Sequence, residues 1–190
     1  MKSAFFSGLL FLTGFGYCQV KPTDSFSIKQ DAMYAMINNR NMAYVGKPYP
    51  VFSVSAGNKK YSNETLKGKT VFINFWFTAC APCIAEFDEL NRLFDKYGKN
   101  KNFEYVSFTY ENPKEIIRMK KKYHIHYPVF SISQSDCYRL NLNNAFPTSV
   151  ILDAAGNIKY VYSGGQTNKT LISQHFKETI IPLLSRELQL

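Results

Sequence analysis

The sequence contains few of the side chains that bind metals through nitrogen or sulfur. It has only four cysteines and three histidines among 190 residues. A structural zinc site needs four ligands, and one CxxC pair with separated histidines matches that requirement poorly. The scarcity argues against a zinc-stabilised fold. The hydrophobic content of 45% instead predicts an ordinary globular domain with a full core.

Long apolar runs are also missing, apart from the twelve residues AFFSGLLFLTGF near the N-terminus. A membrane-spanning helix needs about 20 such residues. Lys2 precedes the run, and Gly16 and Cys18 occupy positions −3 and −1 of an expected cleavage site, which is typical of a secretion signal. We therefore predict a signal peptide over residues 1–18 and a mature protein in the periplasm or otherwise outside the cytoplasm. A lipid or membrane anchor through Cys18 is the alternative, which the bulky Tyr17 disfavours.

Acidic residues are scarce relative to basic ones, 14 against 23, and the formal net charge is +9. Such a balance can indicate a nucleic acid, an anionic membrane surface or an acidic partner. The basic residues are scattered, however, apart from RMKKKYHIH at residues 118–126, where we expect the solvated face of a helix. No nucleic-acid motif accompanies them, so we predict no nucleic-acid partner.

The order of the predicted elements indicates an α/β fold. Thr70–Phe77, TVFINFWF, is apolar on both faces, as expected of a central strand. The residues that follow, up to Tyr97, carry apolar side chains at helical spacing, and Gly98 ends that helix. FEYVSFTY predicts the next strand, and NPKEIIRMKKKY predicts a helix capped by Asn112 and started by Pro113.

The C-terminal part adds an antiparallel component. TSVILDAAGNIKYVYS predicts a hairpin that turns at residues 153–157, and the closing helix is expected to bend near Pro182. Strands that alternate with helices, followed by a hairpin, predict a mixed central β-sheet flanked by helices over residues 46–190. Residues 19–45 are polar and form an N-terminal extension, with one short amphipathic run in DAMYAMI.

Cys80 and Cys83 lie where the central strand gives way to the following helix. A helix N-terminus stabilises a thiolate, which is the species that attacks disulfides. Cys83 lies one turn later, within reach of a disulfide, and Pro82 suits the first helical turn. A structural disulfide across so short a loop removes little chain entropy. Redox chemistry is therefore the favoured interpretation, with zinc binding and a structural bridge as alternatives.

The remaining candidate ligands do not form an obvious site. Removal of Cys18 leaves an odd number of cysteines, so at least one thiol stays unpaired within a monomer. Cys137 is interpreted as a buried inert thiol, with a third redox participant or an intermolecular link as alternatives. His124 and His126 alternate along an extended run and could face one side, but a metal needs more ligands than these two. We predict no metal site.

Three segments resemble the thioredoxin superfamily, and within it the exported TlpA/ResA type of thiol–disulfide oxidoreductase. They are VGKPYPVFSV, LKGKTVFINFWFTACAPCIAEF and AFPTSVILDAAGNIKYVYSG. The resemblance runs from about Val45 to the C-terminus. A CxxC motif alone is common, whereas a CxxC after a strand ending in FW, with FPTS further along, is specific. The resemblance implies a thioredoxin-like fold.

The resemblance also implies roles for individual residues. Cys80 and Cys83 are the catalytic pair, and Glu86 passes protons to or from Cys83, unless Glu86 only complements the helix dipole. The family pairs an extended substrate with the backbone of the residue before a cis-proline, here Phe146 before Pro147. The implied substrate-binding residues are Trp76, Ala81, Pro82, Phe146 and Pro147.

Two positions depart from the pattern of the relatives. Asn74 stands where thioredoxin carries a buried Asp, which makes Glu86 the expected proton handler. Ala79 precedes the first cysteine, where many relatives have Trp. The smaller side chain changes the surface beside Cys80, and so affects partner specificity more than chemistry.

Together these features predict an exported thiol–disulfide oxidoreductase that reduces protein disulfides in the cell envelope, with cytochrome c maturation as one role. No histidine lies between the cysteines to stabilise a Cys80 thiolate, and a Glu86 carboxylate raises a nearby cysteine pKa, which disfavours a strong oxidant. We predict a monomer without a cofactor, and a membrane-bound thiol–disulfide donor that restores the dithiol. The alternatives are a Sco-like copper-binding module and a peroxiredoxin-like thiol peroxidase.

Overall fold

The computed structural model describes residues 25–56 and 59–190. The signal peptide predicted at residues 1–18 lies outside these residues. In chain order, the elements are α1 (Ser25–Met42), β1 (Ser53–Ala56), β2 (Lys59–Ser62), α2 (Asn63–Leu66), β3 (Thr70–Phe75), α3 (Ala81–Tyr97), β4 (Phe103–Thr109), α4 (Pro113–Tyr123), β5 (Val129–Ser131), α5 (Gln134–Leu140), β6 (Thr148–Leu152), β7 (Ile158–Ser163), α6 (Lys169–His175), the π-helical turn η1 (Phe176–Ile180) and α7 (Ile181–Glu187).

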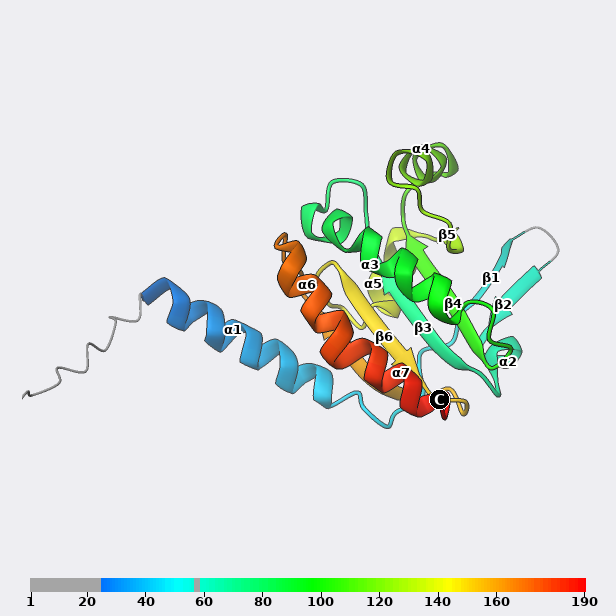
Figure 1. Ribbon diagram of the computed structural model, residues 1–190, viewed down its shortest axis with the longest axis horizontal. Coiled ribbons are helices and arrows are strands. Elements are labelled where there is room, and N and C mark those ends of the chain that lie inside the picture. The colour runs from blue at the N-terminus through cyan, green and yellow to red at the C-terminus, as the bar shows by residue number, and fades with distance from the viewer. Residues whose placement is uncertain (1–24, 57–58) are drawn as a thin grey trace, which may run out of the picture.

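Five strands form one mixed sheet in the order β5-β4-β3-β6-β7 (Figure 1). β3, β4 and β5 are parallel, whereas β6 and β7 pair antiparallel with their neighbours. All residues of β3 are buried, which explains why its sequence is apolar on both faces. The mixed sheet and the late hairpin predicted from the sequence are confirmed. A separate antiparallel pair, β1 and β2, precedes them.

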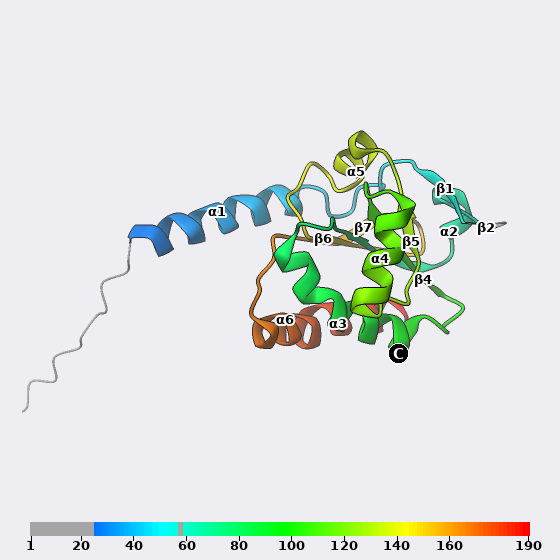
Figure 2. The same cartoon turned by 90° about the horizontal axis from the view of Figure 1, so that it is seen from above.

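Helices cover both faces of this sheet (Figure 2). One face packs against α3, α4 and the C-terminal helices, and the other packs against α5. The alternation of side chains along β3 divides the core between the two layers: Phe72 faces α3 and Phe87, while Ile73 faces the layer that contains Leu140 of α5. This arrangement fixes the start of α3 at the carboxyl end of the central strand.

The N-terminal extension contains a longer helix than the sequence predicted. α1 leads away from the sheet in both views (Figures 1 and 2), and Met33 and Met36 of the expected amphipathic run are exposed. Its apolar residues are spread around the helix rather than collected on one side. Its C-terminal end is attached to the domain through Asn144, whose Nδ2 donates to Asn41 Oδ1 over 3.0 Å. Within the described residues, no helix has both the length and the apolar composition needed to cross a membrane.

Two predicted helix boundaries have specific physical causes. Gly98 ends α3 as predicted, but its φ of −62° is right-handed rather than the left-handed conformation usual for a terminal glycine. A Cβ at Gly98 would lie 2.6 Å from Phe94 O, so close packing requires the glycine. The closing helix changes register through η1, which ends at Ile180, two residues before Pro182, and Pro182 cannot donate a backbone hydrogen bond.

Candidate active site

The two cysteines are joined at the N-terminus of α3. Cys80 N donates to Phe77 O over 3.2 Å, which closes a turn between the residues that follow β3 and the start of α3. Cys80 is the N-cap of α3 and forms a disulfide with Cys83, with Cα atoms 5.2 Å apart. Cys83 N–H donates to Cys80 Sγ over 3.2 Å. This amide at the N-terminus of α3 therefore points at the sulfur of Cys80, where it favours a thiolate after reduction.

Two segments from the antiparallel side of the sheet lie close to Pro82, the residue between the two cysteines that precedes Cys83. The Phe146–Pro147 peptide bond is cis, and Pro147 directly precedes β6, the neighbour of β3. A Cβ added to Gly165 would lie 2.5 Å from Pro147 Cδ and 2.6 Å from Pro82 Cβ. Only a residue without a side chain fits between the two prolines. Pro82, Pro147 and Gly165 thus bring three distant segments together beside the cysteines.

Glu86 lies three positions after Cys83 on α3, and its side chain is only 2% exposed. Residues three apart lie on the same side of a helix. Burial raises the pKa of Glu86 to about 8, because desolvation disfavours the charged carboxylate. Burial likewise raises the pKa of Tyr105 and Tyr127, and the charge of a nearby ionised Glu86 adds to both increases. Glu86 is therefore a buried acid near Cys83 that changes charge close to neutral pH.

Asn74 contributes no acid to this site. Asn74 is buried in β3 and its Nδ2 donates to Ser149 Oγ over 3.3 Å, so the sheet contributes an amide here rather than a carboxyl group. Glu89, one turn beyond Glu86, is paired with Arg92 over 2.5 Å. The alternative for Glu86 was an acid in the first turn that complements the helix dipole, but Glu86 is the sixth residue of α3 and lies beyond that turn.

The structure corrects the predicted position of Trp76 relative to the substrate. Its side chain is 0% exposed, so it cannot contact a partner protein from this position. Trp76 Nε1 donates to Ser107 Oγ over 3.0 Å, and its ring packs edge-on against Phe87 of α3. The residue supports the helix that carries the cysteines. By contrast, Ala81 is exposed next to Cys80, as is Ala79 on the other side.

Cys137, His124 and His126, the other residues considered for redox chemistry or metal binding, take part in the packing and hydrogen bonding of the fold. Cys137 is a free thiol, 0% exposed in α5 on the opposite face of the sheet, and burial raises its pKa to about 12. An inert thiol fits this environment. His124 ends α4 in the left-handed conformation, with φ 54°, and His126 Nε2 contacts Asp95 Oδ1 at 2.7 Å. Within residues 25–56 and 59–190, no three or more His, Cys, Asp or Glu side chains are grouped to hold a metal ion.

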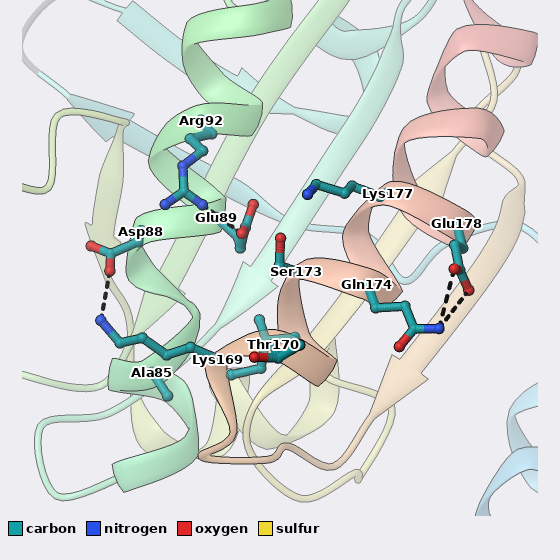
Figure 3. Close-up of a pocket in the computed structure, with 11 residues that line it drawn as sticks. Ala85, Asp88, Glu89, Arg92, Lys169, Thr170, Ser173, Gln174, Lys177 and Glu178 are labelled. Atoms are coloured by element: carbon teal, nitrogen blue, oxygen red, sulfur yellow. Dashed lines mark hydrogen bonds and ion pairs between the residues drawn. The ribbon is translucent and has the colours of Figure 1, made fainter.

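A charged groove lies between α3 and the C-terminal helices, with a volume of about 520 Å³ (Figure 3). Lys169 pairs with Asp88 across the groove over 2.8 Å, and Gln174 donates to Glu178 over 3.1 Å. The cysteines do not line it. The Lys169–Asp88 pair joins α6 to α3, but both side chains are more than half exposed, so it contributes little to stability.

Sequence reasoning missed a cluster of aromatic side chains beside the disulfide. Phe77, Tyr110, Tyr138 and Phe146 contact one another in a chain of ring pairs with centroids 5.3 to 6.0 Å apart. A signal was present, because FWF and FTY end two neighbouring parallel strands, and residues after such ends meet at the same sheet edge. The contributions of Tyr138 and Phe146 depend on tertiary contacts that no local pattern encodes.

Comparisons with known proteins agree with this geometry. Residues 44–175 match the model of the Redoxin family. The chain belongs to this family. It is 32% identical over 129 residues to the thiol-disulfide oxidoreductase ResA of a Bacillus cereus strain, covering 67% of this chain and 74% of that protein. It is 29% identical over 129 residues to the thioredoxin-like protein YneN of Bacillus subtilis (strain 168), covering 66% and 75%.

Solved structures show the same fold. A thiol:disulfide interchange protein of the thioredoxin family from Chlorobium tepidum TLS superposes with a TM-score of 0.53 and 25% identity, covering 67% of this chain and 94% of that one. A thiol-disulfide oxidoreductase from Bacteroides fragilis NCTC 9343 superposes with a TM-score of 0.54 and 24% identity, covering 67% and 98%. The chain is thus a thiol–disulfide oxidoreductase of the ResA type with a thioredoxin-like fold.

Proposed function

We propose that this oxidoreductase reduces disulfide bonds of proteins outside the cytoplasm. The observation that carries the proposal is the Cys80–Cys83 disulfide at the start of α3, with the buried acid Glu86 one turn beyond Cys83. Pro147 and Gly165 complete the site on the other side. Catalytic roles for the two cysteines and Glu86, and substrate contacts through Ala81, Pro82, Phe146 and Pro147, are part of this proposal.

The proposed cycle transfers two electrons and needs no cofactor, because the cysteines carry the electrons. The Cys80 thiolate attacks one sulfur of a partner disulfide, which forms a mixed disulfide and releases the first partner thiolate. Cys83 then gives its proton to the Glu86 carboxylate, and the Cys83 thiolate attacks Cys80 Sγ. The Cys80–Cys83 disulfide forms, and the second partner sulfur leaves as a thiolate that takes up a proton.

The surroundings of the cysteines favour the reducing direction. An oxidant owes its potential to a strongly stabilised reduced thiolate, as in DsbA. Ala81 and Pro82 supply no positive charge to Cys80, and an ionised Glu86 next to Cys83 would raise a thiol pKa rather than lower it. The range from thioredoxin to DsbA is about 150 mV, or about 7 kcal/mol for two electrons. We place this chain near the thioredoxin end of it.

The cellular setting follows from the predicted export signal at residues 1–18. Outside the cytoplasm, thiols are not kept reduced by a cytosolic pool, so the cycle needs a membrane-bound thiol–disulfide donor to restore the dithiol. Protein disulfides of the cell envelope are the proposed substrates. Apocytochrome c, whose CxxCH motif attaches haem, is one proposed substrate among the envelope proteins. We propose a monomeric enzyme.

The experiment that tests the proposal is a measurement of the reduction potential of the Cys80–Cys83 pair. The purified mature protein is equilibrated with dithiothreitol redox buffers, and free thiols are counted by mass after alkylation. A reversible two-electron transition near about −270 mV supports a reductant. A value of about −120 mV would show that the protein acts as an oxidant, opposite to the proposed direction of electron flow. If no reversible pair is found, oxidoreductase function is excluded, and metal binding by the reduced protein should be measured next.

A further inference from the structure

The helix α1 is attached to the domain by a buried polar side chain. Among the α1 side chains that the structure describes, Asn41 alone is buried, at 2% exposed, whereas Met33 and Met36 are exposed. Burial of an amide is costly unless its polar atoms are hydrogen-bonded. A helix that packs through asparagine rather than through an apolar side chain therefore makes a contact that depends on one specific partner.

That partner is Asn144, in the segment that leads from α5 to the cis peptide bond. Asn41 Oδ1 accepts from Asn144 Nδ2 over 3.0 Å, and Arg40 Nη2 donates to Asn144 Oδ1. Asn144 Nδ2 also donates to Asn141 O over 3.1 Å. Both donor hydrogens of the Asn144 amide are thus used, and its oxygen accepts from a charged donor. α1 supplies two of these three partners.

The same segment is closed from within by Asn141. Its Oδ1 accepts from Asn144 N over 3.1 Å, and its Nδ2 donates to Asn144 O over 2.9 Å. Between the two asparagines, Leu142 and Asn143 have φ values of 61° and 54°, in the left-handed region that residues with a side chain rarely adopt. Such a conformation persists only where the surrounding structure holds it. Asn144 is the residue through which both the internal bonds and α1 hold this turn.

The backbone between Asn144 and Pro147 is short and is itself bonded to the sheet. Asn144 lies three residues before Pro147, and Thr148 Oγ1 at the start of β6 donates to Ala145 O over 2.6 Å. Pro147 in turn lies close to Pro82, between the cysteines. A continuous series of contacts therefore runs from the C-terminal turn of α1 to the turn that carries the reactive disulfide.

We propose that Asn41, assisted by Arg40, is a positioning residue of the active site. Its bond to Asn144 fixes the segment that ends in Phe146 and Pro147, and so fixes that segment relative to the cysteines. The inference rests on the proposed function, in which a substrate polypeptide contacts Phe146 and Pro147. α1 thus belongs to the part of the protein that aligns an incoming polypeptide disulfide, although neither of its two residues touches the reacting sulfur atoms.

A positioning role and a merely structural attachment differ in which substrates they affect. A small disulfide reaches Cys80 without a polypeptide that must be aligned along residues 146–147, so it reports the intrinsic reactivity of the cysteines. A polypeptide disulfide needs that alignment as well. Loss of a positioning residue therefore lowers the rate with the polypeptide relative to the small disulfide, whereas loss of a structural bond in a protein that stays folded leaves the ratio of the two rates unchanged.

The test measures this ratio of rates in the full chain. The probes are a symmetrical disulfide dimer of a decapeptide with one central cysteine, and hydroxyethyl disulfide. The reduced protein is mixed with each, and the second-order rate of its oxidation is followed by quenched mass analysis. Urea denaturation of each variant shows that it is folded under the assay conditions.

Four variants separate the role of the hydrogen bond from other effects. Asn41→Leu removes the acceptor at similar volume, and Asn41→Asp retains an acceptor for Asn144. Arg40→Ala removes the second α1 bond at an exposed side chain, so the fold should tolerate it. Asn63→Leu is the matched control, because Asn63 Nδ2 donates to Tyr49 O over 3.2 Å but lies in α2, before the amino end of β3, whereas the cysteines follow the carboxyl end.

We expect Asn41→Leu to lower the ratio of the peptide rate to the hydroxyethyl disulfide rate by about 3- to 30-fold, because a small displacement of a positioning group is costly in rate. Arg40→Ala should lower the same ratio to a smaller extent. Asn41→Asp should keep a ratio close to that of the wild type, and Asn63→Leu should leave it unchanged.

An unchanged ratio in folded Asn41→Leu and Arg40→Ala would overturn the inference and leave the oxidoreductase function intact. A decrease that Asn41→Asp shares fully would also overturn it, because the acceptor would then not be the cause. If Asn41→Leu does not fold, Arg40→Ala decides by the same ratio. Failure of the wild type to react with either disulfide would instead remove the proposed function.

Discussion

Replacement of Glu86 by Gln should make the folded protein more stable at alkaline pH. Glu86 is 2% exposed, and burial raises its pKa from 4.5 to about 8. Between these values the folded state keeps a proton that the unfolded state has released, so the free energy of unfolding falls as pH rises. Below pH 4.5 both states bind the proton and above about 8 neither does. The decrease in the free energy of unfolding is therefore complete at about pH 9.

The size of the effect follows from the same two values. Each pH unit across the interval changes the free energy of unfolding by about 1.4 kcal/mol. The interval from 4.5 to about 8 therefore gives about 5 kcal/mol as an upper value. Local relaxation around a charged carboxylate reduces it, and we expect about 2–5 kcal/mol. Glu86→Gln, which never ionises, should lack this loss.

Urea denaturation of the oxidised protein at pH 5, 6, 7, 8 and 9 measures the difference. The wild type and Glu86→Gln should be close at pH 5 and diverge steadily as pH rises, with the variant more stable. Glu64→Gln removes one exposed, surface carboxylate and controls for the general change of charge. Parallel curves for the wild type and Glu86→Gln would refute the reasoning, because they would show that the carboxyl group ionises equally in both states.

Three further predictions test the surroundings of the site. Gly165→Ala should destabilise the fold by about 1–3 kcal/mol in urea denaturation and slow disulfide exchange, because the added Cβ would clash with Pro147 and Pro82. A variant as stable as the wild type would contradict the close packing. His175→Phe should lessen the loss of stability as pH falls below 6.5. Burial lowers the pKa of His175 in the folded protein, so the unfolded chain takes up the proton first. The same loss of stability at acid pH in the variant and the wild type would contradict this. Cys137 should react with iodoacetamide only after unfolding, and Cys137→Ala should exchange disulfides at the wild-type rate, whereas rapid labelling of the native thiol would show that it is accessible.

Much of the fold was predictable because its core elements have strong local signals. β3 is a nearly continuous apolar run because both its faces are covered, and α3 begins and ends at residues with clear physical roles. The cysteine pair was predictable for the same reason, since its position between a strand and a helix already favours a thiolate. Local sequence therefore specifies both the scaffold and the point on it where the reactive sulfur lies.

The surroundings of that sulfur were less predictable, because they are assembled from distant segments. The family resemblance implied that Trp76 contacts the substrate, but its indole N–H donates to Ser107 on the next strand and the ring is buried. Phe77, the next residue, belongs to the aromatic cluster with Tyr110, Tyr138 and Phe146. Both Trp76 and Phe77 follow the end of β3 at Phe75, so no strand pattern determines which of the two is buried and which is partly exposed.

The position of Glu86 connects stability with the proposed chemistry. A buried acid without a cationic partner among the described residues lowers stability at alkaline pH, and Gln would fill the same space without that loss. Such a residue is expected where its proton is used.

The Glu86→Gln variant should therefore be more stable than the wild type. It should also lengthen the lifetime of the mixed disulfide on Cys80, by about 10- to 100-fold near pH 8, because Cys83 loses its proton acceptor. Stopped-flow mass analysis of the mixed disulfide measures this in the same preparations. A variant that gains stability and resolves the mixed disulfide as fast as the wild type would show that the carboxyl group takes no part in the exchange.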